Sequence, residues 1–282
     1  MDKTIFLQVL ASGVIHSLWN FAAKKSSGNL AVNWLAQLVG IAVLLPFALI
    51  EDGFSAVSPI GVLCVAAAGV IQAFYFWLLS AAYRTGEISV VYPVARGLGI
   101  AGAAVVGVIF FSEVVTEIGG LGILVIAVGT LIIGVGQMRQ RGASFAPVIW
   151  AIAIGSSLVL GSFVDKTGVS AAPPVTYLCL VYIVSAVLSA PLFLWRYREG
   201  IHLAVHSQKR LVSVVGVGAV LSYLIVLHAL RTGPLGYILA VREVAVVGGA
   251  VLGFVFLSEK IFFAKIVGIA AIVCGIVLIR IS

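Results

Sequence analysis

The sequence predicts an all-α integral membrane protein in which ten transmembrane helices form two inverted five-helix repeats. Composition gives the class, because hydrophobic residues make up 62% of the chain and charged residues only 10%, whereas soluble domains carry roughly 25% charged residues. The helices follow from ten apolar runs, each near the roughly 20 residues that cross a hydrocarbon core about 30 Å thick. The repeats follow from one long motif that occurs twice.

The repeated motif begins with Arg-Thr-Gly, continues as an apolar helix that carries an arginine, and ends with Ser-Glu. It covers Arg84–Glu113 and returns at Arg231–Glu259. A repeat of this length divides the chain into two related halves, which we place at residues 1–141 and 142–282. Because each half has an odd number of spans, the second half enters the bilayer from the opposite side. The axis that relates the halves then lies in the membrane plane.

Loops that hold most of the charged and turn-forming residues separate the predicted spans. In chain order the spans are about 5–23, 31–50, 60–83, 88–111, 118–137, 146–164, 172–195, 211–230, 235–257 and 262–280. The first run, with Lys3 before it and Ala22 near its end, has features of a signal peptide. It has a counterpart near 146–166, however, so we predict that it is a membrane helix.

Loop charge gives one prediction for the orientation of the chain. Lysine and arginine gather in alternate loops, for example at Lys24, Lys25, Lys209 and Arg210. Such loops stay cytoplasmic, which places both termini outside. Contact with anionic lipid accounts for the basic loops, so the bilayer is the expected partner and nucleic acid is not.

Known catalytic and metal-binding patterns are absent from the sequence. Cys64, Cys179 and Cys274 fall inside spans without Cys-x-x-Cys spacing, so neither a disulfide nor a metal site is expected. The metalloprotease, hydrolase and phosphate-loop motifs are also missing, which predicts a protein that is not an enzyme and needs no cofactor. We expect Ser112–Glu113 and Ser258–Glu259 to cap helix ends.

Small residues predict where the two halves touch. Ala103 and Gly107 lie four residues apart in the fourth span, and Gly249 and Gly253 lie at equivalent places in the ninth. This spacing lets helix backbones approach closely in lipid. We therefore expect spans four and nine to be in contact.

These features together resemble the EamA type of the drug/metabolite transporter superfamily. The matching stretches are Pro93–Arg96 through Ser112–Glu113, Val241–Arg242 through Ser258–Glu259, and His16–Asn20 in the first span. The resemblance covers essentially the whole chain. It implies alternating access to a central cavity that binds small metabolites, in a multi-pass protein of a bacterial plasma (inner) membrane. It also implies cytoplasmic termini, in conflict with the loop charges, and the orientation stays open.

Charged side chains inside spans are the leading candidates for a substrate site, because ionisable groups in a bilayer are functional by default. Arg96 lies in the fourth span, Arg242 and Glu243 lie in the ninth, and Lys265 lies near the start of the tenth. Two arginines against one acid leave room for a substrate carboxylate, phosphate or phosphonate, which guanidinium binds through paired hydrogen bonds. The alternative is structural: Glu243 pairs with one arginine, and the other binds backbone, water or lipid.

Polar residues on four other spans complete the candidate substrate site. Ser12, His16, Asn20 and Lys24 recur every four residues and share one helix face, which either lines a cavity or makes interhelical hydrogen bonds. His16 either couples proton movement or holds a fixed hydrogen bond. The remaining candidates wall a cavity or pack in the core; they are Gln72, Tyr75, Tyr92, Ser222 and Tyr223.

The sequence therefore predicts a secondary carrier of a small organic solute that is anionic or zwitterionic. An ion gradient or a counter-substrate would drive it, because the chain has no nucleotide-binding motif. One alternative is an exporter of amino acids or cationic drugs, against which the excess of buried arginine argues. The other is a non-transporting membrane scaffold or a membrane enzyme. Four tryptophans near span ends are predicted to lie at the membrane interface; they are Trp19, Trp34, Trp150 and Trp195.

Overall fold

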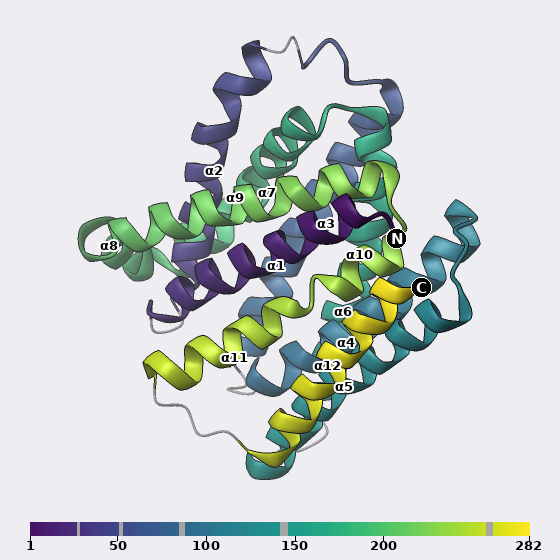
Figure 1. The fold of residues 1–282 in the computed structure, drawn as a ribbon. Coiled ribbons are helices and arrows are strands. Elements are labelled where there is room, and N and C mark those ends of the chain that lie inside the picture. Colours follow the sequence, from purple (N-terminus) through teal and green to yellow (C-terminus); the bar gives the residue numbers. More distant parts are fainter. Residues whose placement is uncertain (27–28, 51–52, 85–87, 142–145, 258–261) are drawn as a thin grey trace.

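The computed structural model describes residues 1–26, 29–50, 53–84, 88–141, 146–257 and 262–282, and these residues are mostly helical (Figure 1). Ten helical segments are long and apolar enough to cross a membrane, which confirms the predicted fold class and the number of spans. The helices are α1 Lys3–Lys24, α2 Leu30–Ile50, α3 Pro59–Arg84, α4 Ile88–Phe111, α5 Glu117–Arg141, α6 Ala146–Ala171, α7 Pro174–Arg196, α8 Arg198–Ser207, α9 Lys209–Thr232, α10 Leu235–Val241, α11 Val244–Leu257 and α12 Phe263–Ile281.

The spans contact one another in a closed ring. Its order is α12, α5, α4, α6, α3, α7, α2, α9, α1 and α11, which returns to α12. Each span of the first half has a counterpart five spans later in the chain. When every span is exchanged with its counterpart, the order of contacts around the ring is the same but runs in the opposite direction. A two-fold relation between two five-span repeats would produce this symmetry. The proposed boundary between residues 1–141 and 142–282 stays a prediction, and residues 142–145 lie outside the described part of the chain.

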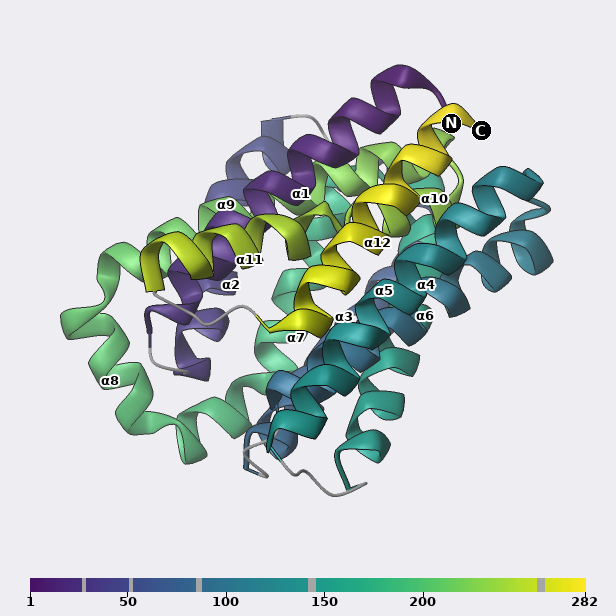
Figure 2. The same cartoon turned by 60° about the horizontal axis from the view of Figure 1, so that its bottom comes forward.

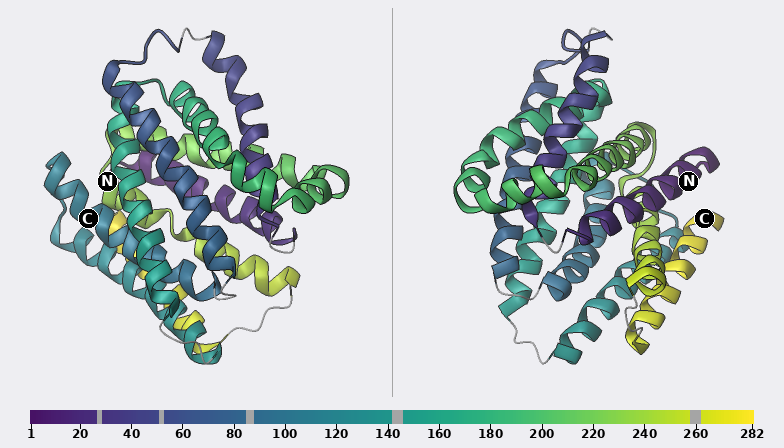
Figure 3. Two further views of the ribbon diagram at one scale, coloured as in Figure 1. Left: turned by 180° about the vertical axis from the view of Figure 1, so that it is seen from behind. Right: turned by 90° about the vertical axis from the view of Figure 1, so that its left-hand side faces the viewer.

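The two ends of the chain lie near each other in every view (Figures 2 and 3). α1 begins at Asp2, whose side chain accepts the backbone N–H groups of Ile5 and Thr4, and these hydrogen bonds lower the pKa of Asp2. Near this point the Arg280 guanidinium of α12 lies 5.7 Å from the ring centre of Phe6. An even number of spans places both termini on one side, as both orientation predictions require.

Glycines bring the backbones of α5 and α12 together. A Cβ atom added to Gly129 would lie 2.8 Å from the carbonyl oxygen of Gly268, and one added to Gly268 would lie 2.5 Å from that of Gly129. Gly122 and Gly275 form an equivalent pair, with distances of 2.8 and 2.6 Å. Backbones approach this closely in lipid only where side chains are very small. The last spans of the two halves are therefore joined through these glycines.

This contact predicts a stability effect. We expect Gly268→Ala to lower the free energy of unfolding by about 1–3 kcal/mol, because the added methyl group overpacks a backbone contact. Gly249→Ala is the matched control, since no atom lies within 4 Å of a Cβ at that position. Detergent-induced unfolding of the purified variants measures both. Equal stability of the Gly268→Ala variant and the wild type would contradict the packing argument.

Spans four and nine touch as predicted, but at a different place. α4 packs against α10, where a Cβ on Gly236 would lie 2.9 Å from the Cα of Ala104. Gly107 also faces α10, because a Cβ there would lie 3.6 Å from the Cβ of Leu235. Gly249 faces open space, and the described part of α11 has no contact of similar extent with α4. The predicted use of Gly249 is therefore wrong, and that of Gly253 stays a prediction.

The tryptophans divide between the surface and the interior. Trp195 is 89% exposed, as expected for an interfacial residue. Trp34 is buried instead, stacks on Phe193 of α7 with ring centres 5.4 Å apart, and donates from Nε1 to the carbonyl oxygen of Ala186 at 3.2 Å. The interfacial assignment of Trp34 is wrong, because α7 covers this face of α2.

Candidate functional site

The ninth span is interrupted at its charged residues. α10 ends at Val241 and α11 begins at Val244, so Arg242 and Glu243 form the turn between them. The predicted ninth span is present at Leu235–Phe256, but this turn divides its helix in two. At the turn, N–H groups donate to carbonyl oxygens three residues back, from Ala245 to Arg242 at 3.0 Å and from Val246 to Glu243 at 2.8 Å. In membranes such breaks occur where protein or a cavity surrounds them, and transporters use them as binding sites.

α1 packs directly over this break. A Cβ on Gly13 would lie 2.3 Å from Cγ1 of Val244 and 3.1 Å from the carbonyl oxygen of Arg242. One turn later, a Cβ on Gly248 would lie 2.6 Å from Oγ of Ser17. The missing side chain at Gly13 therefore lets α1 approach the turn.

Arg96 and Glu243 form an ion pair between spans four and nine. Nη2 of Arg96 contacts Oε1 of Glu243, and the two side chains are 13% and 1% exposed. The Arg96 guanidinium also lies 5.9 Å from the ring centre of Tyr92, one turn earlier on α4. Tyr75 of α3 is half-buried and packs against the apolar core clusters that contain Leu79 and Ala82. The predicted pairing of Glu243 with an arginine is thus present, and the partner is Arg96.

Arg242 has a different set of neighbours. Its Nη2 lies 3.0 Å from Nδ1 of His16, and its guanidinium lies 5.3 Å from the ring centre of Tyr223 on α9. A guanidinium only donates hydrogen bonds, so His16 accepts at Nδ1 and its ring is neutral. His16 therefore acts here as a fixed acceptor for Arg242.

The break also leaves a hydrogen-bond donor and an acceptor unpaired. Among the described residues, neither Nε of Arg242 nor Oε2 of Glu243 has a hydrogen-bond partner. Arg242 is 8% exposed and Glu243 is 1% exposed. Buried polar groups are nearly always paired. The two atoms, on adjacent residues, are therefore candidates for contact with a ligand or with water.

Asp165 belongs to the same polar region, although the sequence analysis placed it beyond the end of the sixth span. It lies inside α6, is 6% exposed, and accepts the hydroxyl groups of Tyr177 at 2.8 Å and of Tyr223. α6 continues past residue 164, and there the hydroxyl groups of Thr167 and Ser170 bond to carbonyl oxygens four residues back, a common arrangement for such side chains inside a helix. The predicted span ended at residue 164 because polar residues begin at Asp165, and this end is too early.

This acid changes the charge balance. The buried site contains two arginines, Arg96 and Arg242, and two acids, Glu243 and Asp165. The predicted excess of buried arginine over acid is therefore wrong. The four charges cancel when every one of these groups is ionised.

The remaining sequence candidates divide between the site and its surroundings. Ser12 donates to the carbonyl oxygen of Ser222 at 2.7 Å, and Nε1 of Trp19 donates to Oγ of Ser222 at 3.1 Å. Trp19 also lies edge-on to His16, with ring centres 4.7 Å apart, so it belongs to this polar layer. These bonds join α1 to α9. Asn20 and Gln72 are half-buried, and Lys24 is exposed.

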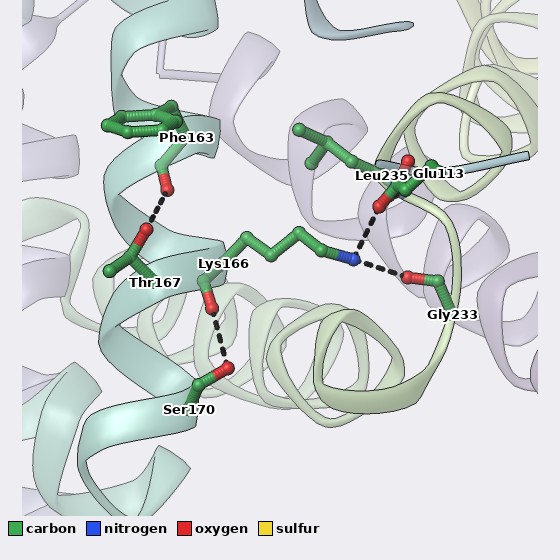
Figure 4. Close-up of polar contacts among 7 residues, drawn as sticks. All are labelled: Glu113, Phe163, Lys166, Thr167, Ser170, Gly233 and Leu235. Carbon is green, nitrogen blue, oxygen red and sulfur yellow. Dashed lines mark hydrogen bonds and ion pairs between the residues drawn. The ribbon is translucent and has the colours of Figure 1, made fainter. Parts of the chain in front are cut away.

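A second ion pair lies at the start of α10 (Figure 4). Nζ of Lys166 is 2.6 Å from Oε1 of Glu113 and 2.8 Å from the carbonyl oxygen of Gly233. The Glu113 carboxylate accepts the N–H of Leu235 at 2.9 and 2.8 Å, so it caps α10, where a negative charge is favourable. The backbone N–H of Glu113 also donates to the carbonyl oxygen of Gly107 at 3.1 Å, so this residue caps the end of α4 as well. The other predicted cap, Ser258–Glu259, lies outside the described residues.

The contact between Lys166 and Glu113 predicts a closed end of the molecule. Glu113→Gln keeps an acceptor for the N–H of Leu235 but loses the ion pair, whose removal from a buried site costs about 3–5 kcal/mol. We expect a Leu235→Cys reporter to react at least about tenfold faster with a water-soluble maleimide in the Glu113→Gln background. Native cysteines are removed, and Glu117→Gln on the exposed start of α5 is the control. Unchanged labelling would show that this ion pair does not hold the end closed.

The ten long apolar helices of the described residues indicate a multi-pass integral membrane protein. Residues 145–281 match the EamA-like transporter family, and residues 32–128 match the Small Multidrug Resistance protein family. The two matched stretches lie in different halves of the chain, and together they confirm its resemblance to EamA-type membrane transporters of the drug/metabolite transporter superfamily.

A solved structure supports the fold independently of these matches. It is described only as "Crystal structure of protein", is 16% identical to this chain, and superimposes with a TM-score of 0.74. The match covers 100% of this chain and 98% of the other. No curated protein sequence matches the chain.

Proposed function

We propose that this protein is a secondary transporter that moves a small organic solute by alternating access. The solute carries a carboxylate, phosphonate or organic phosphate, or is a zwitterion. The observation that supports this most directly is that Nε of Arg242 and Oε2 of Glu243, on adjacent residues of the ninth span, are buried and lack a hydrogen-bond partner. An anionic group satisfies the first, and an ammonium or hydroxyl group of the same solute satisfies the second.

The environment of the two buried acids argues against a cationic drug as the substrate. Glu243 already pairs with Arg96, and Asp165 already accepts two tyrosine hydroxyl groups. A cation bound near Arg242 would add positive charge beside a buried guanidinium. Such repulsion in a low-dielectric site is costly. An amino acid remains compatible, because its own charges cancel.

Alternating access requires that each side of the site open in turn. The ion pair between Lys166 and Glu113 joins α6 to the start of α10, and α10 runs from there to Arg242. Opening this end would release the helix that carries the site. Because the chain has no nucleotide-binding motif, an ion gradient or a counter-substrate would drive transport. The expected location is a bacterial plasma (inner) membrane.

The test is a ligand screen followed by transport. Purified protein is heated with carboxylates, phosphonates, amino acids and amines, and a ligand present at 100 times its Kd stabilises the fold by about 2.7 kcal/mol. Compounds that stabilise are then tested for uptake into liposomes that contain the protein. Stabilisation and uptake of anions or zwitterions are expected. Activity with amines alone would overturn the proposal, and binding without uptake would favour a scaffold.

A further inference from the structure

We propose that Asp165 is the proton-binding site that couples this transporter, and that it takes up a proton when an anionic group binds at Arg242. This inference rests on the proposed function and names its coupling ion. Asp165 lies within a membrane span and is 6% exposed. Its hydrogen-bond donors are the neutral hydroxyl groups of Tyr177 and Tyr223. A buried carboxylate in this position is a candidate for a proton relay.

The titratable and charged groups that interact with Asp165 lie on α3, α7, α9 and the break in the ninth span. Tyr177 and Tyr182 face it from α7, Tyr223 from α9, Cys64 from α3 and Arg242 from the break. The buried cation of α4, Arg96, is engaged by Glu243. Within the described part of the chain, no lysine or arginine lies at ion-pair distance from Asp165. Arg242 is therefore the cation whose charge Asp165 balances from a distance.

Tyr223 connects these two charges physically. Its hydroxyl donates to Oδ2 of Asp165, and its ring lies 5.3 Å from the Arg242 guanidinium. When Asp165 is ionised, it offsets the positive charge of Arg242. When a proton adds to Asp165, Arg242 loses this compensation and attracts an anion more strongly. Binding free energies are reciprocal, so a bound anion favours the protonated form of Asp165 by the same factor.

The charge balance of the site also predicts that one proton binds with each monoanion. Arg96, Arg242, Glu243 and Asp165 cancel in the empty site while His16 is neutral. A monoanion alone would leave one uncompensated charge in a buried site, which is unfavourable. One proton, taken from water onto the Asp165 carboxylate, restores neutrality. Anion and proton therefore enter the site together.

The experiment uses pyruvate and methanesulfonate as probes, because each keeps a single negative charge across the pH range. Their Kd values are measured at several pH values for the wild type, Asp165→Asn and Glu199→Gln. Glu199 is an exposed carboxylate of α8 outside the spans, which makes its substitution a matched control. In parallel, infrared difference spectra follow the carbonyl stretch of a protonated carboxylic acid in liposomes with and without each probe.

We expect the wild-type Kd to rise about tenfold per pH unit once Asp165 is ionised in the empty protein, as one linked proton requires. Glu199→Gln keeps this slope, whereas Asp165→Asn binds with an affinity that no longer depends on pH. The probe strengthens the carboxylic acid band in the spectrum of the wild type but not in that of Asp165→Asn. Tyr177→Phe provides a second variant: it removes one donor to the carboxylate and extends tight binding to higher pH.

Two failures have different meanings. A wild-type slope that survives in Asp165→Asn, or a probe that leaves the carboxylic acid band unchanged, overturns proton coupling at Asp165 and leaves anion transport standing. Failure of both probes to bind the wild type at every pH overturns anion binding at Arg242, and proton coupling with it.

Discussion

Replacing Arg242 by glutamine is expected to abolish high-affinity binding of anionic solutes while the fold is retained. A substrate anion left without its buried partner loses about 2–5 kcal/mol of binding free energy. The glutamine amide ends two bonds short of Nη2 of Arg242, so it does not replace the donor that this atom provides to His16. Arg242→Lys should fall between the wild type and Arg242→Gln, because it keeps the charge but lacks the planar fork.

The measurement is uptake and binding of the anions selected by the ligand screen, with folding checked by size-exclusion chromatography. Arg280→Gln is the control, since Arg280 is an exposed arginine at the end of α12. Arg96→Gln serves as a comparison, because Arg96 forms an ion pair with Glu243. We expect that variant mainly to lose stability. Wild-type affinity in Arg242→Gln would leave this arginine structural and the substrate class open again.

Glu243→Gln is expected to lower stability and raise affinity for anions at the same time. The side chain is 1% exposed and pairs with Arg96. Removing one partner of a buried ion pair costs about 3–5 kcal/mol, because the other charge is left without compensation. The same change gives the site a net positive charge, which favours a bound anion.

A double-mutant cycle tests the first half of this expectation. The double variant with Arg96→Gln and Glu243→Gln removes both charges together, so it should be more stable than the sum of the single effects predicts. Unfolding by detergent gives the free energies, and binding of the selected anion gives the affinities. Additive stability losses would show that the contact between Arg96 and Glu243 is energetically unimportant. Unchanged anion affinity in Glu243→Gln would show that this carboxylate does not compete with the substrate.

Several parts of the site could be predicted from the sequence. Arg96, Arg242 and Glu243 are charged residues inside apolar runs, and lipid makes such residues conspicuous. The four-residue spacing of Ser12 and His16 placed both on one face of α1, and both indeed make buried hydrogen bonds. The contact between spans four and nine followed from their small residues, although the residues that form it differ.

Other features had no readable local signal. The turn at Arg242 and Glu243 contains neither proline nor glycine, so propensity favours an unbroken helix. Asp165 followed an apolar run and looked like a loop residue, but hydroxyl groups of α7 and α9 bind it from residues far away in sequence. The cap that Glu113 provides for α10 likewise joins segments distant in the chain.

The sequence alone determined the membrane class, the ten spans and the duplicated motif, because the bilayer imposes length and apolarity on each span separately. Tertiary structure decided which charges meet. Adjacent Arg242 and Glu243 contact partners on different helices, one at His16 of α1 and the other at Arg96 of α4. The break in the ninth span and the burial of Asp165 depend on those long-range contacts, and the energy of a buried charge depends on which partner the fold brings to it.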